Sequence, residues 1–468
     1  MIFFTKIHPL IIYAADDWTY IGHLRKPIPS PNEYNPGKVF PEVIQPIMAR
    51  ISTHFVYPAT KDFIYSISIV YGVVLSIFVL LYFYEFYKLI KYLFPNISFA
   101  ALFLLTSLFI IFHFSIFKVE NTNNRFMFYE IDPNYVYNYT VPNILNCILI
   151  MYLIRHNFKI KSSKVELCLL MVLGYFSIFS NLFSTGISII IISLEFVYGF
   201  IRTLKAKTSP TNYIHSKWYS IVIFLFWSLL VLLEGTGSRA HDVGTTFNLS
   251  ESISTFTSNF HILNVPTGLI ILLSIIGALL LYSKNNLKEK DSQINKTLII
   301  CALCAIADSL FIILLCAKTG TSYIKRIGVL YGIVFYSFII SLISLAIIIE
   351  YFNKSVYILL LFCLALISLT YSKDKTFKES IMYNINPSSA KQVDNDIMNQ
   401  IISNIQSEAT SMTLTVTQSE KNDNWPHSNY IGERICNSLF ELNIIDHTFP
   451  ITINPDLQMN QKYNIEYR

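Results

Sequence analysis

Long apolar segments recur along this chain, and they constrain its fold more than any other feature. A helix needs about 20 apolar residues to cross the hydrocarbon core of a membrane. Only 14% of the 468 residues are charged, against about 25% in a typical soluble protein. The sequence therefore predicts an α-helical polytopic membrane protein whose apolar segments are 63–87, 97–117, 138–154, 165–183, 185–201, 218–234, 266–283, 297–316, 327–350 and 355–371.

Residues 2–15 form a shorter apolar run that has two interpretations. It has the features of a cleavable signal peptide, with Lys6 near its start and Ala14-Ala15 before the cut. The alternative is a retained first span, either short or beginning upstream. We favour the retained span, because the acidic pair that follows would need a membrane anchor. Together with the ten longer segments it predicts eleven crossings.

Lysine and arginine are concentrated in alternate loops between the apolar segments. They follow the 63–87 segment and recur in 155–164, 202–217 and 284–296. The positive-inside rule places such loops in the cytoplasm. The N-terminus is then inside, and the C-terminus lies outside with the loops 16–62, 119–137, 235–262 and 317–326. Basic residues confined to short interhelical loops exclude nucleic acid as a partner.

The tail from residue 372 is polar and contains no segment long enough to span a membrane. Val393, Ile397, Ile401 and Ile405 recur every four residues, which predicts an amphipathic helix. We expect a second helix over 432–442 and strands at 413–417 and 449–453. The chain thus divides into a first span with an outer loop (1–62), a transmembrane helical domain (63–371) and a small α/β extracytoplasmic domain (372–468).

Asp16 and Asp17 are the leading candidates for catalysis. They precede Trp18 and a proline-rich loop, at the boundary where a first span would leave the membrane. Transfer of a sugar to a hydroxyl group needs a base, and a positioned carboxylate can act as one. Adjacent like charges also raise the pKa of one carboxyl group toward neutrality. The alternative is a polar pair that simply ends a helix, and the loop and the topology favour the base.

Other polar residues of the outward loops are secondary candidates. Glu33 and Glu42 would contact acceptor hydroxyl groups or lie in solvent, and Lys38 follows a glycine and would approach a donor phosphate. Arg125 lies in a loop rich in Tyr and Asn, residues that stack on sugar rings and bind hydroxyl groups. Tyrosine is, however, enriched at any membrane interface.

Two further loops carry candidate anion-binding residues. Arg239 follows Gly235 and Gly237, and its guanidinium offers a bidentate fork for phosphate. Basic residues without an acid occupy the outward loop 317–326, where cations should be sparse. These residues predict an anion there, either a polyprenyl-phosphate head group or an outer-leaflet lipid, and they are Lys318, Lys325 and Arg326.

An acidic pair after a first span, many further spans and an outward C-terminal domain together resemble the C-type glycosyltransferase superfamily. The tail is more specifically similar to the serotype-converting O-antigen glucosyltransferases of enteric bacteria and their phages. That likeness rests on Asn424-Trp425-Pro426-His427, on Tyr430 to Cys436 and on Pro455 to Ile465. The architecture covers most of the chain, whereas the closer likeness covers about residues 13–42 and 424–466.

The resemblance implies a mechanism and a location. Glucose would arrive on undecaprenyl phosphate, supplied by a sugar-lipid synthase and a flippase, on the periplasmic face of the bacterial inner membrane. Asp16 or Asp17, with Asp17 preferred, would deprotonate a hydroxyl group of the O-antigen repeat, and the sugar would transfer with inversion. Arg239 or the 318–326 cations would stabilise the departing phosphate. Trp425 and Arg434 in the tail would contact the polysaccharide.

The same resemblance leaves a divalent metal open, since two adjacent aspartates can hold one, although basic residues often serve monophosphate donors instead. Three alternatives differ from this function. An O-antigen polymerase would have a large outward loop in mid-chain. A flippase or transporter would have charged residues lining several spans and internal repeats. Neither feature appears in this sequence, and a tail that is only an interaction module is the third alternative.

Overall fold

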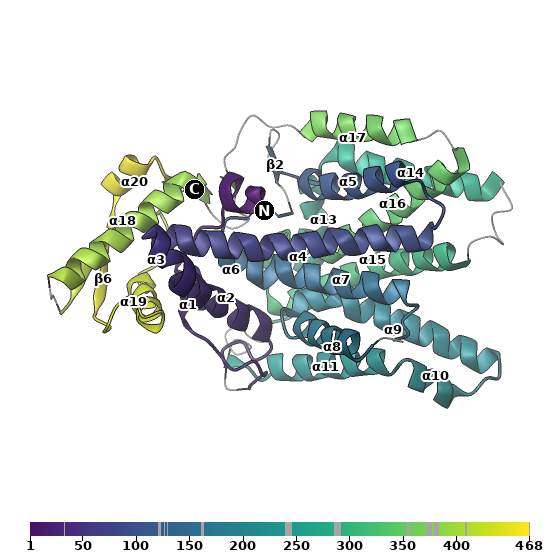
Figure 1. Ribbon diagram of the computed structural model, residues 1–468, viewed down its shortest axis with the longest axis horizontal. Helices are drawn as coiled ribbons and strands as arrows, with labels where there is room; N and C mark the ends of the chain where they lie inside the picture. The colour runs from purple at the N-terminus through teal and green to yellow at the C-terminus, as the bar shows by residue number, and fades with distance from the viewer. Residues whose placement is uncertain are drawn as a thin grey trace.

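The computed structural model describes residues 1–468 apart from 32, 120–122, 126, 129, 161–162, 239–245, 285–291, 353–355, 371–376, 379–382, 408–409 and 468. All ten of the longer apolar segments are helical in it. They form an elongated bundle in which most long helices run along one direction (Figure 1). These helices are α4 (Phe63–Leu93), α5 (Phe99–Ser115), α7 (Val141–Arg155), α8 (Lys164–Ile178), α9 (Leu182–Lys205), α11 (Trp218–Glu234), α14 (Val265–Lys284), α15 (Ser292–Thr319), α16 (Tyr331–Phe352) and α17 (Val356–Thr370).

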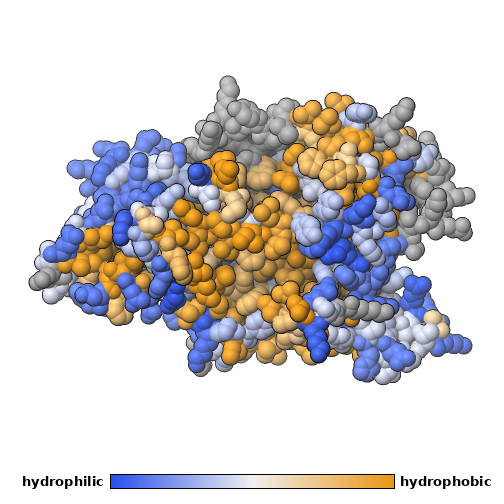
Figure 2. Space-filling view, viewed as in Figure 1, coloured by the Kyte–Doolittle hydropathy of each residue, from blue (hydrophilic) through white to orange (hydrophobic). Residues whose placement is uncertain are grey.

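Several of these helices are suited to a membrane. Within the described ranges, α4, α9, α15 and α16 are long and apolar enough to cross one. The short helix α10 (Pro210–Ser216) and α11 make a fifth candidate if the pair, bent by 71°, counts as one span. The middle of the molecule presents a mostly hydrophobic surface, and hydrophilic residues gather toward both ends (Figure 2). The chain is therefore a helical membrane protein by its composition and helix lengths. The count of eleven crossings stays a prediction, since only four or five long spans are found among the described residues.

The prediction of a helical span over residues 2–15 is wrong. A five-residue π-helix, η1 (Phe3–Ile7), is followed by non-helical chain to Ala14. Residues 10–14 are at most 1% exposed, and Ile11 N donates to the carbonyl of Ile131 at 2.9 Å. These 14 residues are too few to cross a bilayer as a helix, and Phe4 and residues 10–14 are buried inside the protein instead. No spanning helix precedes Asp16 within residues 1–31.

Polar residues mark where several of the long helices begin. Asp62 caps α4 by accepting from Tyr65 N at 2.9 Å, and Ser98 caps α5 by accepting from Ala101 N at 3.2 Å. Ser163 and Asn181 cap α8 and α9 in the same way. Such caps satisfy backbone N–H groups that have no partner in the first turn of a helix. Each of these helices thus starts where a polar loop gives way to an apolar run.

Shorter elements connect the long helices. The N-terminal third contains α1 (Ala15–Gly22), α2 (Val39–Ile51), η2 (Ser52–Val56) and α3 (Tyr57–Thr60). Two antiparallel strands, β1 (Phe117–Val119) and β2 (Asn123–Arg125), precede a continuous stretch of α6 (Pro133–Tyr135), η3 (Val136–Thr140) and α7. The later connections contain α13 (Leu249–Ser258), η4 (Asn259–Ile262) and η6 (Thr321–Lys325).

The C-terminal region combines helices with two small sheets. Strands β5 (Met412–Thr417) and β6 (Ile451–Asp456) are parallel, with Met412 opposite Ile451. Strands β3 (Phe377–Lys378), β4 (Tyr383–Ile385) and β7 (Glu466–Tyr467) form an antiparallel sheet in that order. The helices are α18 (Pro387–Gln406), α19 (Ile431–Glu441) and α20 (Leu457–Tyr463). Both helices and both strands expected in the tail are confirmed, with shifts of a few residues at their ends.

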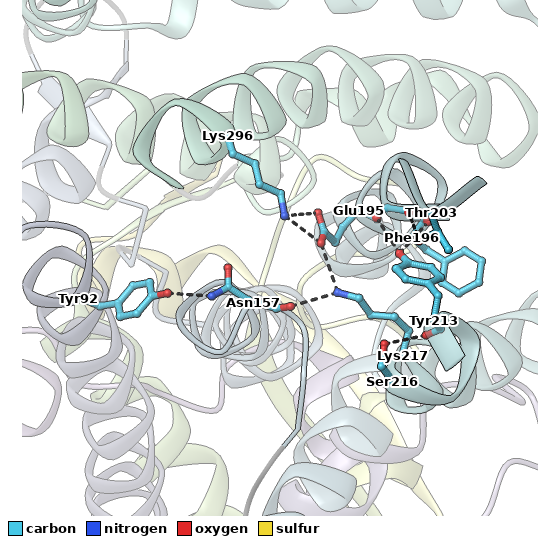
Figure 3. A network of polar contacts seen from close by, with 10 residues as sticks. Tyr92, Asn157, Glu195, Phe196, Thr203, Tyr213, Ser216, Lys217 and Lys296 are labelled. Atoms are coloured by element: carbon cyan, nitrogen blue, oxygen red, sulfur yellow. Dashed lines mark hydrogen bonds and ion pairs between the residues drawn. The ribbon is translucent and has the colours of Figure 1, made fainter. Parts of the chain in front are cut away.

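The loops separate into two sets at opposite ends of the bundle. At one end, Arg155 pairs with Glu85 at 2.6 Å, and Lys217 and Lys296 both pair with Glu195 (Figure 3). The first contact ties the 155–164 segment to the end of α4, and the other two tie the 202–217 segment to the 284–296 segment. Lys217 also donates to the Asn157 carbonyl, which links the two groups. The other end brings α1, α2, α19 and the loop before α16 together. The predicted grouping of the loops agrees with these contacts.

Candidate functional site

A cavity of about 900 Å³ lies at the end of the bundle opposite the Glu195 network. Its wall comes from five parts of the chain that are far apart in sequence: α1, the proline-rich loop with α2, the α6–η3 segment, the loop before α16, and α19. Acids, bases, amides and aromatic rings all face it. The lining residues are Asp16, Thr19, Tyr20, His23, Glu33, Tyr34, Asn35, Lys38, Glu42, Asn134, Asn138, Tyr139, Tyr323, Arg326, Tyr430, Arg434, Asn437, Ser438, Phe440 and Glu441.

The close packing of α1 on α19 forms one corner of the cavity. The Ser438 hydroxyl donates to the carbonyl of Trp18, and Ser438 lies directly over Gly22. A Cβ atom at Gly22 would meet the Ser438 hydroxyl at 2.6 Å, so a larger residue there would push the helices apart. This contact fixes the C-terminal region against the N-terminal helix.

The two aspartates of α1 have different positions. Asp16 is half-buried and lines the cavity, whereas Asp17 is fully buried. Both oxygens of Asp17 accept backbone hydrogen bonds, from Tyr13 N and Ala14 N at 3.0 Å and from Asn134 N at 2.9 Å. Successive residues of a helix point about 100° apart, so the two side chains cannot share one environment. The preference for Asp17 as the base therefore has no support from the geometry, and Asp16 is the aspartate that a substrate can reach.

The electrostatic surroundings of Asp16 suit a base. Burial raises the pKa of its carboxyl group, and the negative charge of Asp132 raises it further. Arg434, Lys38 and Arg326 oppose this rise by favouring the ionised form. A carboxylate with a raised pKa holds an accepted proton more firmly than an exposed one does. Asp16 is thus more basic than an ordinary aspartate, and the three cations beside it favour its ionised form.

Three separate elements supply those cations. Arg326 follows η6, where its Nη1 donates to the Tyr139 hydroxyl at 2.8 Å and its guanidinium lies 4.5 Å from the Tyr323 ring centre. Arg434 projects from α19 and lies 5.8 Å from the Tyr430 ring centre. Lys38 is the N-cap residue of α2. Aromatic rings beside the arginines hold the guanidinium planes while leaving their N–H groups able to bind an anion.

Arg25 holds the proline-rich loop in place. Its guanidinium donates to the Asn35 carbonyl at 2.8 Å and to the Glu42 carboxylate at 2.7 Å. Glu42 also accepts from the Asn35 amide at 3.0 Å. Burial raises the pKa of Glu42, and Arg25 opposes that rise. Glu42 therefore organises the loop as well as lining the cavity, and Glu33 lines it from the same loop.

Several predicted site residues lie elsewhere. Lys318 and Lys325 are exposed and do not line the cavity, although Arg326 next to them does. Trp425 is half-buried against the core and is also outside the cavity wall. Arg239 and the side chain of Arg125 lie outside the described residues. Of the predicted set, the structure brings together Asp16, Glu33, Lys38, Glu42, Arg326 and Arg434.

Sequence reasoning missed much of the rest of the wall. Tyr430, Asn437 and Glu441 were not predicted, and they recur with the predicted Arg434 at helical spacing, so the four form one polar stripe along α19. The opposite, apolar face of the same helix was recognised, and the polar stripe was its available signal. Asn134 and Asn138 are also four residues apart, in the loop already noted for its Tyr and Asn content.

The divalent metal that the superfamily resemblance left open stays a hypothesis. Among the residues that the structure describes, no group of three or more His, Cys, Asp or Glu is placed to hold a metal ion. Asp17 would have been one ligand of an aspartate pair, but backbone N–H groups already occupy both of its oxygens. We therefore assign no step to a metal.

Comparisons with known proteins add no further identification. No family model, curated protein or solved structure matches the chain. The arrangement itself combines four carboxylates with three cations, and Asp16 is the carboxylate whose pKa all three cations lower, with amides and aromatic rings around them. It can hold an anion and a polyhydroxylated molecule next to one another.

Proposed function

We propose that this protein transfers a sugar from a polyprenyl-phosphate carrier to a hydroxyl group of a polysaccharide, on the membrane face where the cavity lies. One observation carries the proposal: Asp16 shares a cavity with Lys38, Arg326 and Arg434 at one end of an apolar helical bundle. A base and a phosphate-binding group must lie within one substrate's length for such a reaction. An apolar bundle beside them suits a donor with a lipid tail.

In this proposal the acidic and basic residues have separate tasks. Asp16 accepts the proton of the attacking hydroxyl group as the glycosidic bond forms. Arg326, Arg434 and Lys38 bind the donor phosphate and stabilise the charge that develops as it leaves. Because the base and the leaving group act on opposite sides of the reacting carbon, the sugar transfers with inversion.

The remaining wall suits an acceptor rich in hydroxyl groups. The amides of Asn134, Asn138 and Asn437 can both donate to and accept from hydroxyl groups. The rings of Tyr20 and Tyr430 offer apolar faces on which a sugar can stack. The polar stripe of α19 thus replaces Trp425 as the proposed contact surface of the tail.

The resemblance noted from the sequence refines the proposal. It favours a glucosyl group on undecaprenyl phosphate as the donor and an O-antigen repeat as the acceptor. The cavity would then face the periplasm, and the basic end would face the cytoplasm, as the positive-inside rule requires. The protein would act in the bacterial inner membrane and change the lipopolysaccharide serotype.

The test is the structure of the O-polysaccharide made by cells with and without the protein, together with transfer by the purified protein. Asp16→Asn should lower the rate of transfer by about 10²–10⁴-fold, the usual contribution of a general base. Asp62→Asn is the matched control, since it is the same change outside the cavity wall and asparagine can still cap α4. Unchanged polysaccharide in cells that contain inserted wild-type protein would contradict the proposal.

A further inference from the structure

A buried contact between two carboxyl groups lies directly behind the cavity wall. Asp17 is fully buried and Asp132 is 6% exposed, and their side chains are within hydrogen-bonding reach of each other. Ionised carboxylates only accept hydrogen bonds, so two of them cannot bond without a proton. Two such groups in one buried site therefore share one proton and carry a single negative charge.

The two acids also join separate parts of the chain through backbone hydrogen bonds. Asp17 accepts from Asn134 N at 2.9 Å, and Asp132 accepts from Tyr135 N at 3.0 Å. The N–H groups of Asn134 and Tyr135 are consecutive, at the start of α6. Asp17 lies in the first turn of α1 and also binds Tyr13 N and Ala14 N. The pair thus fastens the start of α1 to the start of α6.

Both fastened segments contribute cavity-lining residues next to the pair. Asp16 precedes Asp17, Asn134 follows Asp132 by two residues, and Asn138 lies one turn farther on. A displacement of α1 against α6 would therefore change the distance between Asp16 and these amides. Misplacement of a reacting group by about 1 Å can lower a rate by about 10²-fold.

We infer that Asp132 is a positioning residue for Asp16. Its carboxyl group and that of Asp17 share one proton, and this brace holds Asp16 in register with Asn134 and Asn138. The inference deepens the proposed function, because the role of Asp16 rests on it. The brace itself is a property of the folded protein and can be measured without sugar transfer.

The groups around the pair determine how it responds to pH. Asp16 faces Asp132 from α1, and Tyr71 faces Asp17 from α4. Burial raises the pKa of Asp17, and the charge and hydrogen bond of Asp132 raise it further, against the backbone hydrogen bonds. The folded protein therefore binds the shared proton more tightly than the unfolded chain does. The stability that this proton contributes is lost as pH rises through the raised pKa.

Two substitutions of Asp132 distinguish the effect of its contacts from the effect of the shared proton. Asp132→Asn keeps both contacts, because its amide can donate to Asp17 and its oxygen can accept from Tyr135 N. It removes the shared proton. Asp132→Ala removes both contacts. Asp62→Asn serves again as the control for an aspartate change outside the site.

The first measurement is the stability of the purified protein in detergent from about pH 5 to about pH 9. We expect the stability of the wild type to fall as pH rises and that of Asp132→Asn to change less across the same range. If stability changed equally with pH in the wild type, Asp132→Asn and Asp62→Asn, the proposal of a shared proton would be overturned.

The second measurement is the pH profile of sugar transfer. Asp132→Asn should retain transfer with little change in its pH profile, because Asp17 alone then carries the single negative charge that the pair carries in the wild type. Asp132→Ala should lower the rate by about 10²-fold through misplacement of Asp16. An Asp132→Asn variant as inactive as Asp16→Asn at every pH would overturn a positioning role. Absence of transfer by the wild type would overturn only the proposed function, since the stability measurement would stand.

Discussion

The two ends of the helical bundle use the same residue types in opposite ways. At one end, Glu195 accepts from both Lys217 and Lys296, and Lys217 also donates to the Asn157 carbonyl at 3.1 Å (Figure 3). The side chains of Glu195 and Lys217 are 6% and 4% exposed. At the other end, four acids and the cations Lys38, Arg326 and Arg434 line an open cavity.

The difference indicates which end binds a ligand. In the Glu195 network the charges are close together and desolvated, so each one compensates another. In the cavity, Arg326 and Arg434 lie beside tyrosine rings and line the open space. The same chemistry is thus structural at one end and available at the other. The predictions below test this distinction, from the largest expected effect to the smallest.

Among the variants that compare the two ends, Arg326→Gln should have the largest effect on transfer. Loss of a charged donor from the phosphate-binding group should lower the rate by about 10²–10³-fold, as for removal of one donor to a developing negative charge. Lys325→Gln is the matched control, because this neighbouring cation is exposed and outside the cavity wall. Rate assays on purified protein measure both variants. Equal losses of transfer rate for the two variants would contradict a special role for the cation that lines the cavity.

Glu195→Gln should act on stability rather than on chemistry. Removing the acid leaves two lysines without their partner, and breaking a buried pair costs about 3 kcal/mol. Unfolding in detergent measures the change, and transfer per folded molecule should stay unchanged. Lys296→Gln should cost less, because this lysine is 28% exposed. A loss of transfer without a loss of stability would place function at this end as well.

Arg434→Gln should change the pH dependence of transfer. This guanidinium opposes the rise in the pKa of Asp16, so its removal allows that pKa to rise further. A base must be ionised to act, and the acid limb of the rate profile should therefore move to higher pH. A profile measured from about pH 4 to about pH 8 checks the direction. Movement to lower pH would contradict the assignment of Asp16 as the base.

Lys391→Gln should have the smallest effect. Lys391 pairs with Asp62 at 2.8 Å where α18 meets α4, and both side chains are about one-third exposed. Surface ion pairs of this kind contribute less than about 1 kcal/mol. A thermal unfolding measurement in low and high salt checks this limit. A loss of stability as large as that of Glu195→Gln would show that solvent exposure does not determine how much an ion pair contributes in this protein.

The sequence predicted the helices better than the site. Long apolar runs have few alternatives to a helix in a membrane protein, so all ten segments were recognised. The run at 2–15 failed because apolar character does not distinguish a short span from chain buried inside the protein. Its length of 14 residues was the available warning.

Within the site, the sequence indicated the right segments but did not show which side chains point into the cavity. Asp16 and Asp17 are equivalent in sequence, and only the packing of α1 on α6 and α19 shows which one faces the cavity. Lys325 and Arg326 differ in the same way, because η6 turns one outward and the next inward. Asp132 attracted no attention, since its role depends on contact with a residue 115 positions earlier.

The contact between Trp18 and Ser438 has a consequence for biosynthesis. These residues are separated by 420 positions. The cavity wall therefore cannot form until α19, near the end of the chain, has been synthesised and packs on α1. Contacts at such sequence separation form late in folding. A chain released early from the ribosome would insert most of its helices and still have no site. An inserted but incomplete copy would therefore occupy the membrane without a complete cavity.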